Sequence, residues 1–600
     1  MKSLTLLALI ALLAGPASAQ TNIPVGALVA EGEARWEDAL RLYRAQLDRE
    51  PAAAELWLRV ADIEARLGRA SESIAALERA ASARPSDATI SSRLSQAYAA
   101  QGHAIAAQRA IESALAVQPS SEEYLRAHAT LSTWAGNYGP AARSYRKLRQ
   151  AQPQDTDLAL ALARVSVWDG DSDAAASAYR DYLKGSNPLP EAWLELARAE
   201  SWRGNAIAAV DALDQYRDRF GATEAYLRER VYVLARSGRP REALRDLAPL
   251  VAAAPNDYEL QLSRTVALAS LRNHGAAASS LARIDALKPD HSDTRDAESL
   301  VRSLLGSTVG PSTTFYNDSD GLQIFKAAPR LDVGFKSDTR FHGGYELIEL
   351  EARVGSGLEP VSGGRSARVE HGWAGLTQRI GPLTFGGTVG QARVESHSLN
   401  TYAALVKFTP ADTLTVAAER SSGFATISPR TVSLGITKIT NRSAIDWTMA
   451  MRYHLALEAA YEELSDGNTR WEIFVAPRAA VARTQRLNLD LGLLVHQFGA
   501  RQNLDNGYYD PRRYEYYAVV VSPYWKVSEN VGLGASAGIG GQRDAADSRF
   551  RLGSNASAEA TFGIYGPWLL KVHGSTTNNR RLDSGAFRGV SGGIVLLRRF

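Results

Sequence analysis

The chain has 600 residues, of which 45% are hydrophobic and 22% charged, with a formal net charge of +3 and no cysteine. This length exceeds what one hydrophobic core accommodates, and the composition is that of a folded protein, so we expect two or more domains. The near balance of charge leaves no basic footprint for nucleic acid, and the missing thiols exclude disulfides, cysteine nucleophiles, thiolate metal sites and a cysteine-linked lipid anchor.

The first 19 residues have the three parts of a secretion signal. Lys2 supplies positive charge, residues 4–14 form an apolar segment, and residues 17–19 (Ala-Ser-Ala) form a small-residue cleavage site. The apolar segment could instead anchor the chain in a membrane, but it is too short to span a bilayer, and the break at Gly15-Pro16 favours cleavage. No run of about 18 apolar residues follows it, so we expect an exported protein without a transmembrane helix.

A 34-residue period governs the first half of the chain. Glycine recurs at this spacing at Gly68, Gly102, Gly136, Gly170, Gly204 and Gly238, with an alanine five residues after most of them and a proline seventeen residues after most. Each glycine can close a helix, each alanine lets two helices approach closely, and each proline ends the second helix. The pattern resembles the tetratricopeptide repeat (TPR) family and predicts an all-α solenoid of about eight repeats over residues 20–306. Ser73 in place of alanine and Arg272 in place of glycine depart from it.

Three tryptophans share one position in consecutive repeats. Trp134, Trp168 and Trp202 each precede the turn glycine by two residues. Stacked repeats would place them at a constant spacing, as an aromatic track for sugar rings. The alternative is that each packs the end of one helix against the next repeat, which is the commoner role of large aromatic residues. We take the three as candidate polymer-binding residues.

Beyond Gly306 the sequence alternates apolar and polar residues in short segments, as in residues 487–493 and 531–539. Such alternation predicts strands with one apolar face, and turn signals such as residues 505–507 (Asp-Asn-Gly) separate them. A transmembrane strand of about 9–11 residues with its turn uses roughly 18 residues. Residues 307–600 therefore predict an antiparallel transmembrane β-barrel of about 16 strands, wide enough for a water-filled lumen.

The last predicted strand ends at Phe600, with Val590, Gly592, Ile594 and Leu596 at alternate positions. This pattern resembles the signal read by the bacterial outer-membrane insertion machinery, although Arg598 departs from it. A soluble β-sandwich or propeller is the alternative fold. The secretion signal, the terminal Phe and the lack of a blade repeat favour a barrel in outer-membrane lipid.

The sequence predicts neither an enzyme nor a bound cofactor or metal. Residues 589–593 match the G-x-S-x-G motif, but that chemistry needs a turn from strand to helix after the serine, and here it falls inside the last predicted strand. The ten histidines are scattered without ligand spacing, and no phosphate-binding loop is present. Glu462 and Glu463, next to a turn, indicate a solvated face rather than an acid/base pair.

The order of signal, TPR array and barrel resembles the outer-membrane exopolysaccharide export porins, which include the poly-N-acetylglucosamine export porins and the outer-membrane component of bacterial cellulose synthases. The tract of residues 507–511 (Gly-Tyr-Tyr-Asp-Pro) leading into residues 514–517, and the Trp-x-Gly turns of the solenoid, carry this resemblance. It implies passive passage of a polysaccharide chain through the lumen, guided by a periplasmic TPR domain that also contacts periplasmic proteins. It also makes Tyr508 and Tyr509 candidate polymer-binding residues.

Three functions stay open at this point. An exopolysaccharide porin predicts an open lumen lined by polar and aromatic groups, whereas a binding or assembly scaffold predicts a closed or plugged barrel that serves as an anchor. An outer-membrane enzyme predicts converging carboxylates or histidines. A basic excess near the C-terminus favours a neutral or anionic polymer over a cationic one; it comprises Arg580, Arg581, Arg588, Arg598 and Arg599.

Overall fold

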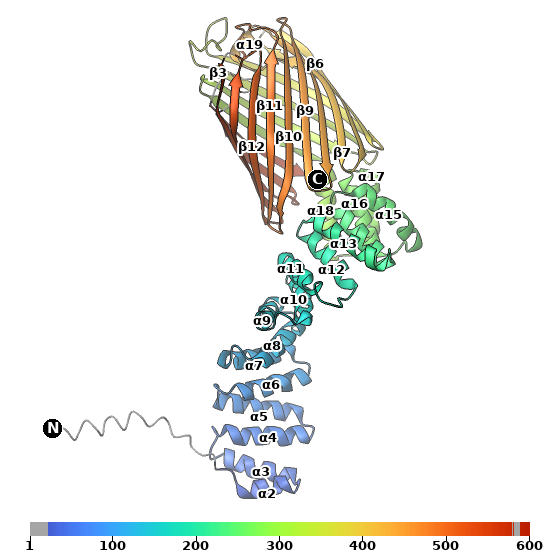
Figure 1. The fold of residues 1–600 in the computed structure, drawn as a ribbon, viewed down its shortest axis with the longest axis vertical. Coiled ribbons are helices and arrows are strands. Elements are labelled where there is room, and N and C mark those ends of the chain that lie inside the picture. Colours follow the sequence, from blue (N-terminus) through green and yellow to red (C-terminus); the bar gives the residue numbers. More distant parts are fainter. Residues whose placement is uncertain (1–21, 396, 546, 579, 581–587) are drawn as a thin grey trace, which may run out of the picture. The chain divides into compact units, whose positions relative to one another are not determined.

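The computed structural model describes residues 22–600 except 396, 546, 579 and 581–587. The expected signal peptide and Arg581 lie outside these residues. The chain separates into two compact units, Met1–Pro188 and Leu189–Phe600, which are described separately. Among its described residues, the first contains helices and no strand, and the second contains both helices and the strands (Figure 1).

The described part of the first unit is a row of paired helices: α2 (Val25–Gly32), α3 (Trp36–Leu47), α4 (Ala54–Arg66), α5 (Ala70–Ala83), α6 (Ala88–Ala100), α7 (Ala104–Val117), α8 (Glu122–Trp134), α9 (Tyr138–Ala151), α10 (Thr156–Trp168) and α11 (Ser172–Tyr182). The second unit continues the pairs with α12 (Glu191–Trp202), α13 (Ala206–Phe220), α14 (Glu224–Arg236), α15 (Pro240–Ala253), α16 (Tyr258–Ser270), α17 (His274–Leu287) and α18 (Ser292–Leu305).

The repeated residues have the roles that their spacing predicts. The six turn glycines adopt φ angles between 73° and 80°, a left-handed conformation that ends one helix and aims the chain back. Arg272 adopts the same conformation with φ 56°, at a cost that glycine would avoid. The alanines at the close helix approach, such as Ala107, Ala141 and Ala243, are fully buried. Ser73 substitutes for alanine by donating a hydrogen bond to the carbonyl of Ala61 at 2.8 Å.

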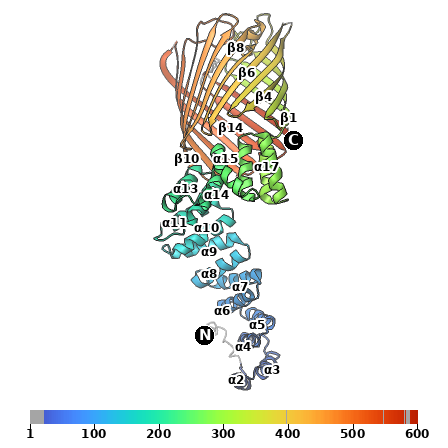
Figure 2. The same cartoon turned by 90° about the vertical axis from the view of Figure 1, so that its right-hand side faces the viewer.

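The strands of the second unit form one closed antiparallel barrel, in which each strand pairs with its neighbours in sequence and β1 pairs with β16 (Figure 2). They are β1 (Thr308–Asp318), β2 (Leu322–Gly334), β3 (Thr339–Ala352), β4 (Ser366–Ile380), β5 (Leu383–Val394), β6 (His397–Ala411), β7 (Leu414–Phe424), β8 (Thr437–Met449), β9 (Tyr453–Leu464), β10 (Thr469–Arg483), β11 (Leu487–Ala500), β12 (Tyr514–Ser528), β13 (Val531–Asp544), β14 (Asp547–Phe562), β15 (Trp568–Thr577) and β16 (Gly589–Arg599). The predicted fold class, a TPR solenoid followed by a barrel of sixteen strands, is confirmed.

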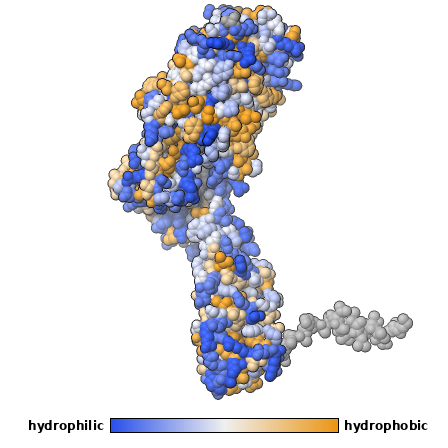
Figure 3. Space-filling view, turned by 180° about the vertical axis from the view of Figure 1, so that it is seen from behind, coloured by the Kyte–Doolittle hydropathy of each residue, from blue (hydrophilic) through white to orange (hydrophobic). Residues whose placement is uncertain are grey.

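Successive residues of each strand face opposite sides of the barrel wall. On β11, Leu491 and Leu493 are exposed on the outside, whereas His496 lines an inner cavity. Hydrophobic side chains gather over the outside of the barrel in the space-filling view (Figure 3). None of the described helices is both long and apolar enough to cross a bilayer.

The two ends of the barrel differ. At one end, here called the turn end, the chain enters at Thr308 and finishes β16 at Arg599, and short turns such as residues 412–413 join the strands. At the other end, the loop end, longer segments join the strands; they include residues 425–436, which contain the helix α19 (Pro429–Ser433), and residues 501–513.

Candidate functional site: the barrel lumen and its two ends

The inner wall of the barrel encloses a cavity of about 760 Å³. Its lining comes from strands on both sides of the closed sheet, because the inward-facing residues of β1, β2, β8–β12 and β14–β16 all contribute. Hydroxyl and amide groups are prominent in it: the Ser575 and Ser591 hydroxyls lie 2.7 Å apart, and the Tyr516 hydroxyl donates to Oδ1 of Asn555 at 2.9 Å. Such groups rotate and exchange partners at low cost, which suits transient contacts with a passing chain.

Ser591 belongs to the sequence that matches G-x-S-x-G. It lies within β16, so no turn from strand to helix follows it, and its hydroxyl contacts another hydroxyl. Among the described residues, no group of three or more histidines and carboxylates has the arrangement to hold a metal ion.

Histidines that are scattered in the sequence share the inner wall. His496 and His573 line the cavity, and the register places His342 and His371 on the same face of the sheet. The ring of His371 contacts the Thr401 hydroxyl at 2.9 Å, and that of His496 contacts the Glu472 carboxylate at 2.8 Å. The sequence did not reveal this grouping, because alternate residues of a strand face the lumen and the strand bounds were not known. Once the bounds are known, counting alternate residues along each strand identifies the histidines that face the lumen.

A buried cluster of ion pairs lies in the barrel wall near the loop end. Nε of Arg470 donates to Oε2 of Glu462 at 2.9 Å, and Nζ of Lys438 donates to Oε1 of the same carboxylate at 2.8 Å. Arg470 is fully buried and Glu462 nearly so, whereas Glu463 is exposed. The expectation of a solvated face is therefore wrong for Glu462, because strand alternation sends adjacent residues to opposite sides of the wall.

Two segments fold across the mouth at the loop end. In the first, α19 places the buried Val432 against Leu350 and Val369, which face the lumen from β3 and β4. In the second, residues 501–513 approach it, and Nε of Arg430 donates to the carbonyl of Asp505 at 3.2 Å. We call these segments, residues 425–436 and 501–513, the mouth loops. The sequence contained no periodic signal for either segment.

The mouth loops contain Tyr508 and Tyr509. The Tyr508 hydroxyl donates to Asp466 at 2.7 Å and accepts from the amide of Asn468, and the Tyr509 hydroxyl donates to the carboxylate of Asp544. Burial, together with these hydrogen bonds to carboxylates, raises the pKa of both phenols above the ordinary value of 10, so both act as neutral donors. The structure thus places them within the loop packing, and their contact with a polymer stays a prediction.

The three solenoid tryptophans are about half exposed, at 53%, 54% and 44% for Trp134, Trp168 and Trp202. They are therefore not core residues, although each of the last two contacts an aromatic neighbour. The ring of Trp168 lies 5.5 Å from that of Tyr138, and Nε1 of Trp202 donates to the Tyr232 hydroxyl at 2.6 Å. Exposed indole faces at a repeated position can stack on sugar rings.

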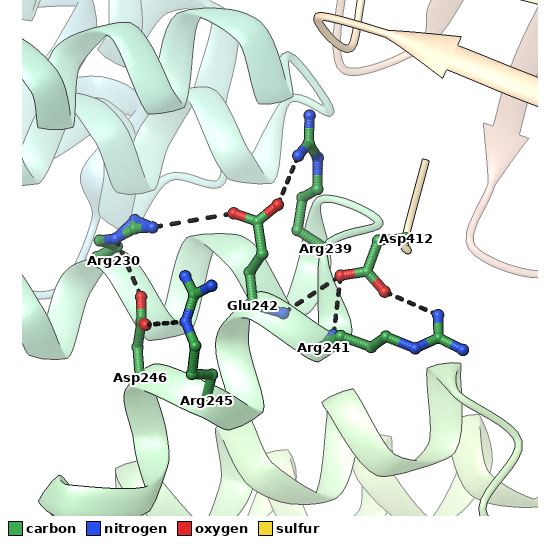
Figure 4. Close-up of polar contacts among 7 residues, drawn as sticks. All are labelled: Arg230, Arg239, Arg241, Glu242, Arg245, Asp246 and Asp412. Atoms are coloured by element: carbon green, nitrogen blue, oxygen red, sulfur yellow. Dashed lines mark hydrogen bonds and ion pairs between the residues drawn. The ribbon is translucent and has the colours of Figure 1, made fainter. Parts of the chain in front are cut away.

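In the second unit, the turn end of the barrel contacts the last repeats through aspartates. The carboxylate of Asp412, between β6 and β7, accepts hydrogen bonds from the backbone N–H groups of Arg241 and Glu242 at 2.9 and 3.2 Å, at the start of α15 (Figure 4). Nη1 of Arg241 also donates to it at 3.2 Å. Asp412 thereby satisfies helix N–H groups that have no partner within the helix, and its charge complements the helix dipole.

A second aspartate repeats this contact one repeat later. Asp338, between β2 and β3, accepts a hydrogen bond from the N–H of His274 at 2.6 Å, at the first residue of α17. A Cβ at Gly275 would collide with the carbonyl oxygen of Lys336, so only glycine permits this approach. At the end of α18, Arg340 donates to the carbonyls of Leu305 and Gly306 at 3.1 and 3.3 Å. Residues at the turn end of the barrel thus cap three helices of the solenoid.

Comparison with known proteins agrees with the first half of the fold. The family model of the tetratricopeptide repeat matches residues 26–88 and 228–292. Among solved structures, a bacterial polysaccharide outer membrane secretin is 13% identical, with 49% of this chain and 98% of that chain covered and a TM-score of 0.42. A tetratricopeptide repeat protein from Parabacteroides merdae is 16% identical, with 41% and 98% covered and a TM-score of 0.30. No curated protein matches the sequence.

The chain thus combines tetratricopeptide repeats with a closed barrel of sixteen strands. This combination is consistent with the resemblance to the TPR-containing exopolysaccharide export porins.

Proposed function

We propose that this protein is a passive outer-membrane conduit for the export of a polysaccharide, in which the TPR domain guides the polymer or its partners to the barrel. The observation that carries the proposal is the closed sixteen-stranded wall around a cavity lined by hydroxyl, amide, imidazole and ionic groups. A conduit needs many weak contacts, because one tight site would stall the chain. The lining supplies such contacts through groups such as the hydroxyls of Ser575 and Ser591.

The two ends of the barrel give the conduit a direction. The apolar outside of the wall contacts outer-membrane lipid, and the turn end, to which the solenoid is joined, faces the periplasm. The mouth loops then face the cell exterior. The insertion machinery of the outer membrane places the barrel in this orientation, and polymer synthesis on the inner side drives the chain outward.

Blocking the lumen chemically tests the proposal. The chain has no cysteine, so a single introduced thiol is the only one that a thiol reagent can modify. Ser591→Cys places a thiol on the cavity wall, and a deletion strain complemented with this variant is treated with a bulky, water-soluble methanethiosulfonate. We expect secreted polysaccharide to fall to the level of the deletion strain and to recover when a reductant removes the adduct.

The adjacent residue provides the matched control. Val590 lies on the same strand but faces outward and is 50% exposed, so modified Val590→Cys should leave secretion unchanged. Mass spectrometry of the purified protein verifies modification of Ser591→Cys. Undiminished secretion by fully modified Ser591→Cys, or normal secretion by the deletion strain, would refute a conduit through this lumen.

The mouth loops favour a second candidate, a periplasmic binding or assembly scaffold anchored by a closed barrel. Val432 and Arg430 hold these loops across the opening in the described structure. A scaffold would make no ion-conducting pore in a planar bilayer and would be insensitive to modification of Ser591→Cys, whereas its deletion would disturb the assembly of periplasmic partners. The same labelled variant therefore separates the two candidates.

A further inference from the structure

An aromatic and cationic cluster lies on the first helices of two consecutive repeats in the second unit. It comprises Trp202 and Arg198 on α12, and Tyr232 and Arg236 on α14, and we call it the Trp–Arg cluster. The two helices contact each other directly. The guanidinium groups of Arg198 and Arg236 lie 4.7 and 3.8 Å from the centre of the Tyr232 ring, and Trp202 donates to the Tyr232 hydroxyl at 2.6 Å.

The two arginines of the cluster differ in their partners. Arg198 forms a two-point ion pair with the buried Glu229, which neutralises it and fixes its position against Tyr232. No carboxylate in the described part of the chain comes within ion-pair distance of Arg236. Nη1 of Arg236 makes one long contact, at 3.4 Å, with the carbonyl of Tyr232. Part of the Arg236 side chain is exposed beside the Tyr232 ring, so its fork of donors is accessible to a ligand, although desolvation lowers the pKa of its guanidinium.

The chemistry of this arrangement selects its ligand. A guanidinium presents two parallel N–H groups, the geometry that a carboxylate accepts. Next to it, the exposed indole of Trp202 offers an apolar face on which the C–H face of a sugar ring can stack. Because Nε1 of Trp202 is already bonded to Tyr232, the indole is fixed in its plane and adds stacking rather than a free donor.

We propose that the Trp–Arg cluster binds a carboxylate-bearing sugar, of the uronic acid type, in the chain that the protein exports. The inference rests on the proposed function and narrows its substrate to an anionic polysaccharide. Arg236 pairs with the carboxylate, Trp202 stacks on the ring that bears it, and Tyr232 with the paired Arg198 holds both in place. One exposed cation makes the contact weak enough for release, as a guiding site requires.

The test measures binding to the purified full-length protein in detergent micelles by isothermal titration calorimetry. The probes are an oligogalacturonate and a neutral maltooligosaccharide of equal length, with oligoglutamate as an acidic peptide. We expect the oligogalacturonate to bind at least about tenfold more tightly than the neutral oligomer, and the difference to shrink as salt is added. Arg236→Gln should remove about tenfold of that affinity, and Arg236→Lys should recover part of it.

Arg219→Gln is the matched control. The Arg219 guanidinium also lies over an aromatic ring, 4.4 Å from the centre of Trp193 in the same unit, but it is not part of the cluster. The Arg219→Gln substitution removes the same charge as Arg236→Gln and should leave oligogalacturonate binding unchanged. Equal thermal unfolding of both variants verifies that neither substitution disturbs the fold.

Three results would overturn the inference: equal affinity for the charged and neutral oligomers, equal losses for Arg236→Gln and Arg219→Gln, or tighter binding of oligoglutamate than of oligogalacturonate. The last would identify an acidic polypeptide as the ligand. None of these bears on the lumen, so secretion that still stops when Ser591→Cys is modified would leave the proposed function standing. Undiminished secretion by fully modified Ser591→Cys, together with oligogalacturonate binding that depends on Arg236, would instead refute the conduit and leave the binding site standing.

Discussion

Asp412 shows how one side chain of the barrel organises a helix of the solenoid. Its side chain is only 2% exposed, and its carboxylate accepts hydrogen bonds from two backbone N–H groups at the start of α15. Asp412→Ala leaves these donors unsatisfied, so we expect the opening of α15 to become easier by about 1–2 kcal/mol. Hydrogen exchange of the peptides covering Pro240–Ala253 measures this as roughly 5–30-fold faster exchange in the variant.

The control for this prediction is Asp218→Ala. Asp218 is 68% exposed and pairs with Arg217 at the surface, an interaction worth little. Exchange in α15 should be the same in this variant as in the natural protein. Unchanged exchange in Asp412→Ala would mean that the solenoid holds α15 without help from the barrel.

His128 makes the stability of the first unit depend on pH. Burial lowers its pKa below the ordinary 6.5, with Glu112 opposing and Arg143 and Lys147 adding to the shift. The folded state therefore keeps the ring neutral, while the unfolded chain takes up a proton near pH 6.5. The stability that His128 contributes is complete above this pH and is lost as pH falls below it. We expect the helical unfolding temperature to drop between about pH 7.5 and about pH 5.5, and His128→Gln to reduce the drop.

Circular dichroism at the helical minimum measures this unfolding temperature at each pH, because the barrel contributes little to that signal. The exposed His103 supplies the comparison, since His103→Gln should leave the drop as large as in the natural protein. A pH profile that is the same for all three proteins would assign the acid sensitivity to other groups.

The same residues show what a sequence can predict at this scale. The spacing identified Trp134, Trp168 and Trp202 as a set, but it could not decide whether the rings are buried, because that depends on the helix behind each one. For Glu462, adjacency to a turn indicated exposure, and the structure instead buries it against Arg470 and Lys438. Its two partners come from neighbouring strands, so only the register could have revealed them.

At the scale of elements, the periodicity of the sequence predicted the repeated helix pairs and the alternating strands. The 34-residue spacing gave the helix pairs, and period-two alternation gave the strands, because both patterns follow from burying one face of a regular element. The helix α19 has five residues, fewer than two helical turns, so it has no periodicity to detect. Its position depends on long-range contacts with β3 and β4, which leave no local signal in the sequence.

These contacts make the mouth loops testable as a constriction. Val432 of α19 is 1% exposed and packs on Leu350 and Val369. Val432→Asp would bury an unpaired carboxylate there at a cost of several kcal/mol, so α19 should leave the mouth. We expect a larger single-channel conductance in planar bilayers than that of the natural protein.

Leu434→Asp is the control for this change, since Leu434 follows α19 directly and is 42% exposed. Its conductance should match that of the natural protein. If Val432→Asp and Leu434→Asp both conduct like the natural protein, α19 does not limit the passage.

At the scale of the whole molecule, the second unit unites the last repeats and the barrel through capped helix ends. Asp338 lies in the turn between β2 and β3 and Asp412 in the turn between β6 and β7, and they cap helices of successive repeats, so the contact follows the period of the solenoid. The order of domains in the sequence predicted that both parts exist, but no local pattern distinguishes these two aspartates from other turn residues. Under the proposed function, these capped ends would couple guidance of a polymer by the last repeats to its passage through the barrel.

That coupling predicts that the solenoid tryptophans matter for export but not for the pore. Because Trp134, Trp168 and Trp202 are about half exposed, their joint replacement by alanine should leave the fold intact. One stacking contact contributes about 0.5–1.5 kcal/mol, which corresponds to roughly 2–10-fold in affinity for a sugar ring. We expect secreted polysaccharide to fall by at least about twofold at equal protein level, while conductance in planar bilayers stays that of the natural protein.

The comparison variant replaces three other exposed apolar residues of the solenoid by alanine, namely Ile105, Val117 and Phe220. It removes a similar kind of surface away from the shared repeat position, so secretion should remain normal. If both triple variants lose secretion equally, the effect lies in general solenoid stability. If neither loses it, the polymer reaches the lumen without stacking on the tryptophans, and the barrel alone accounts for transport.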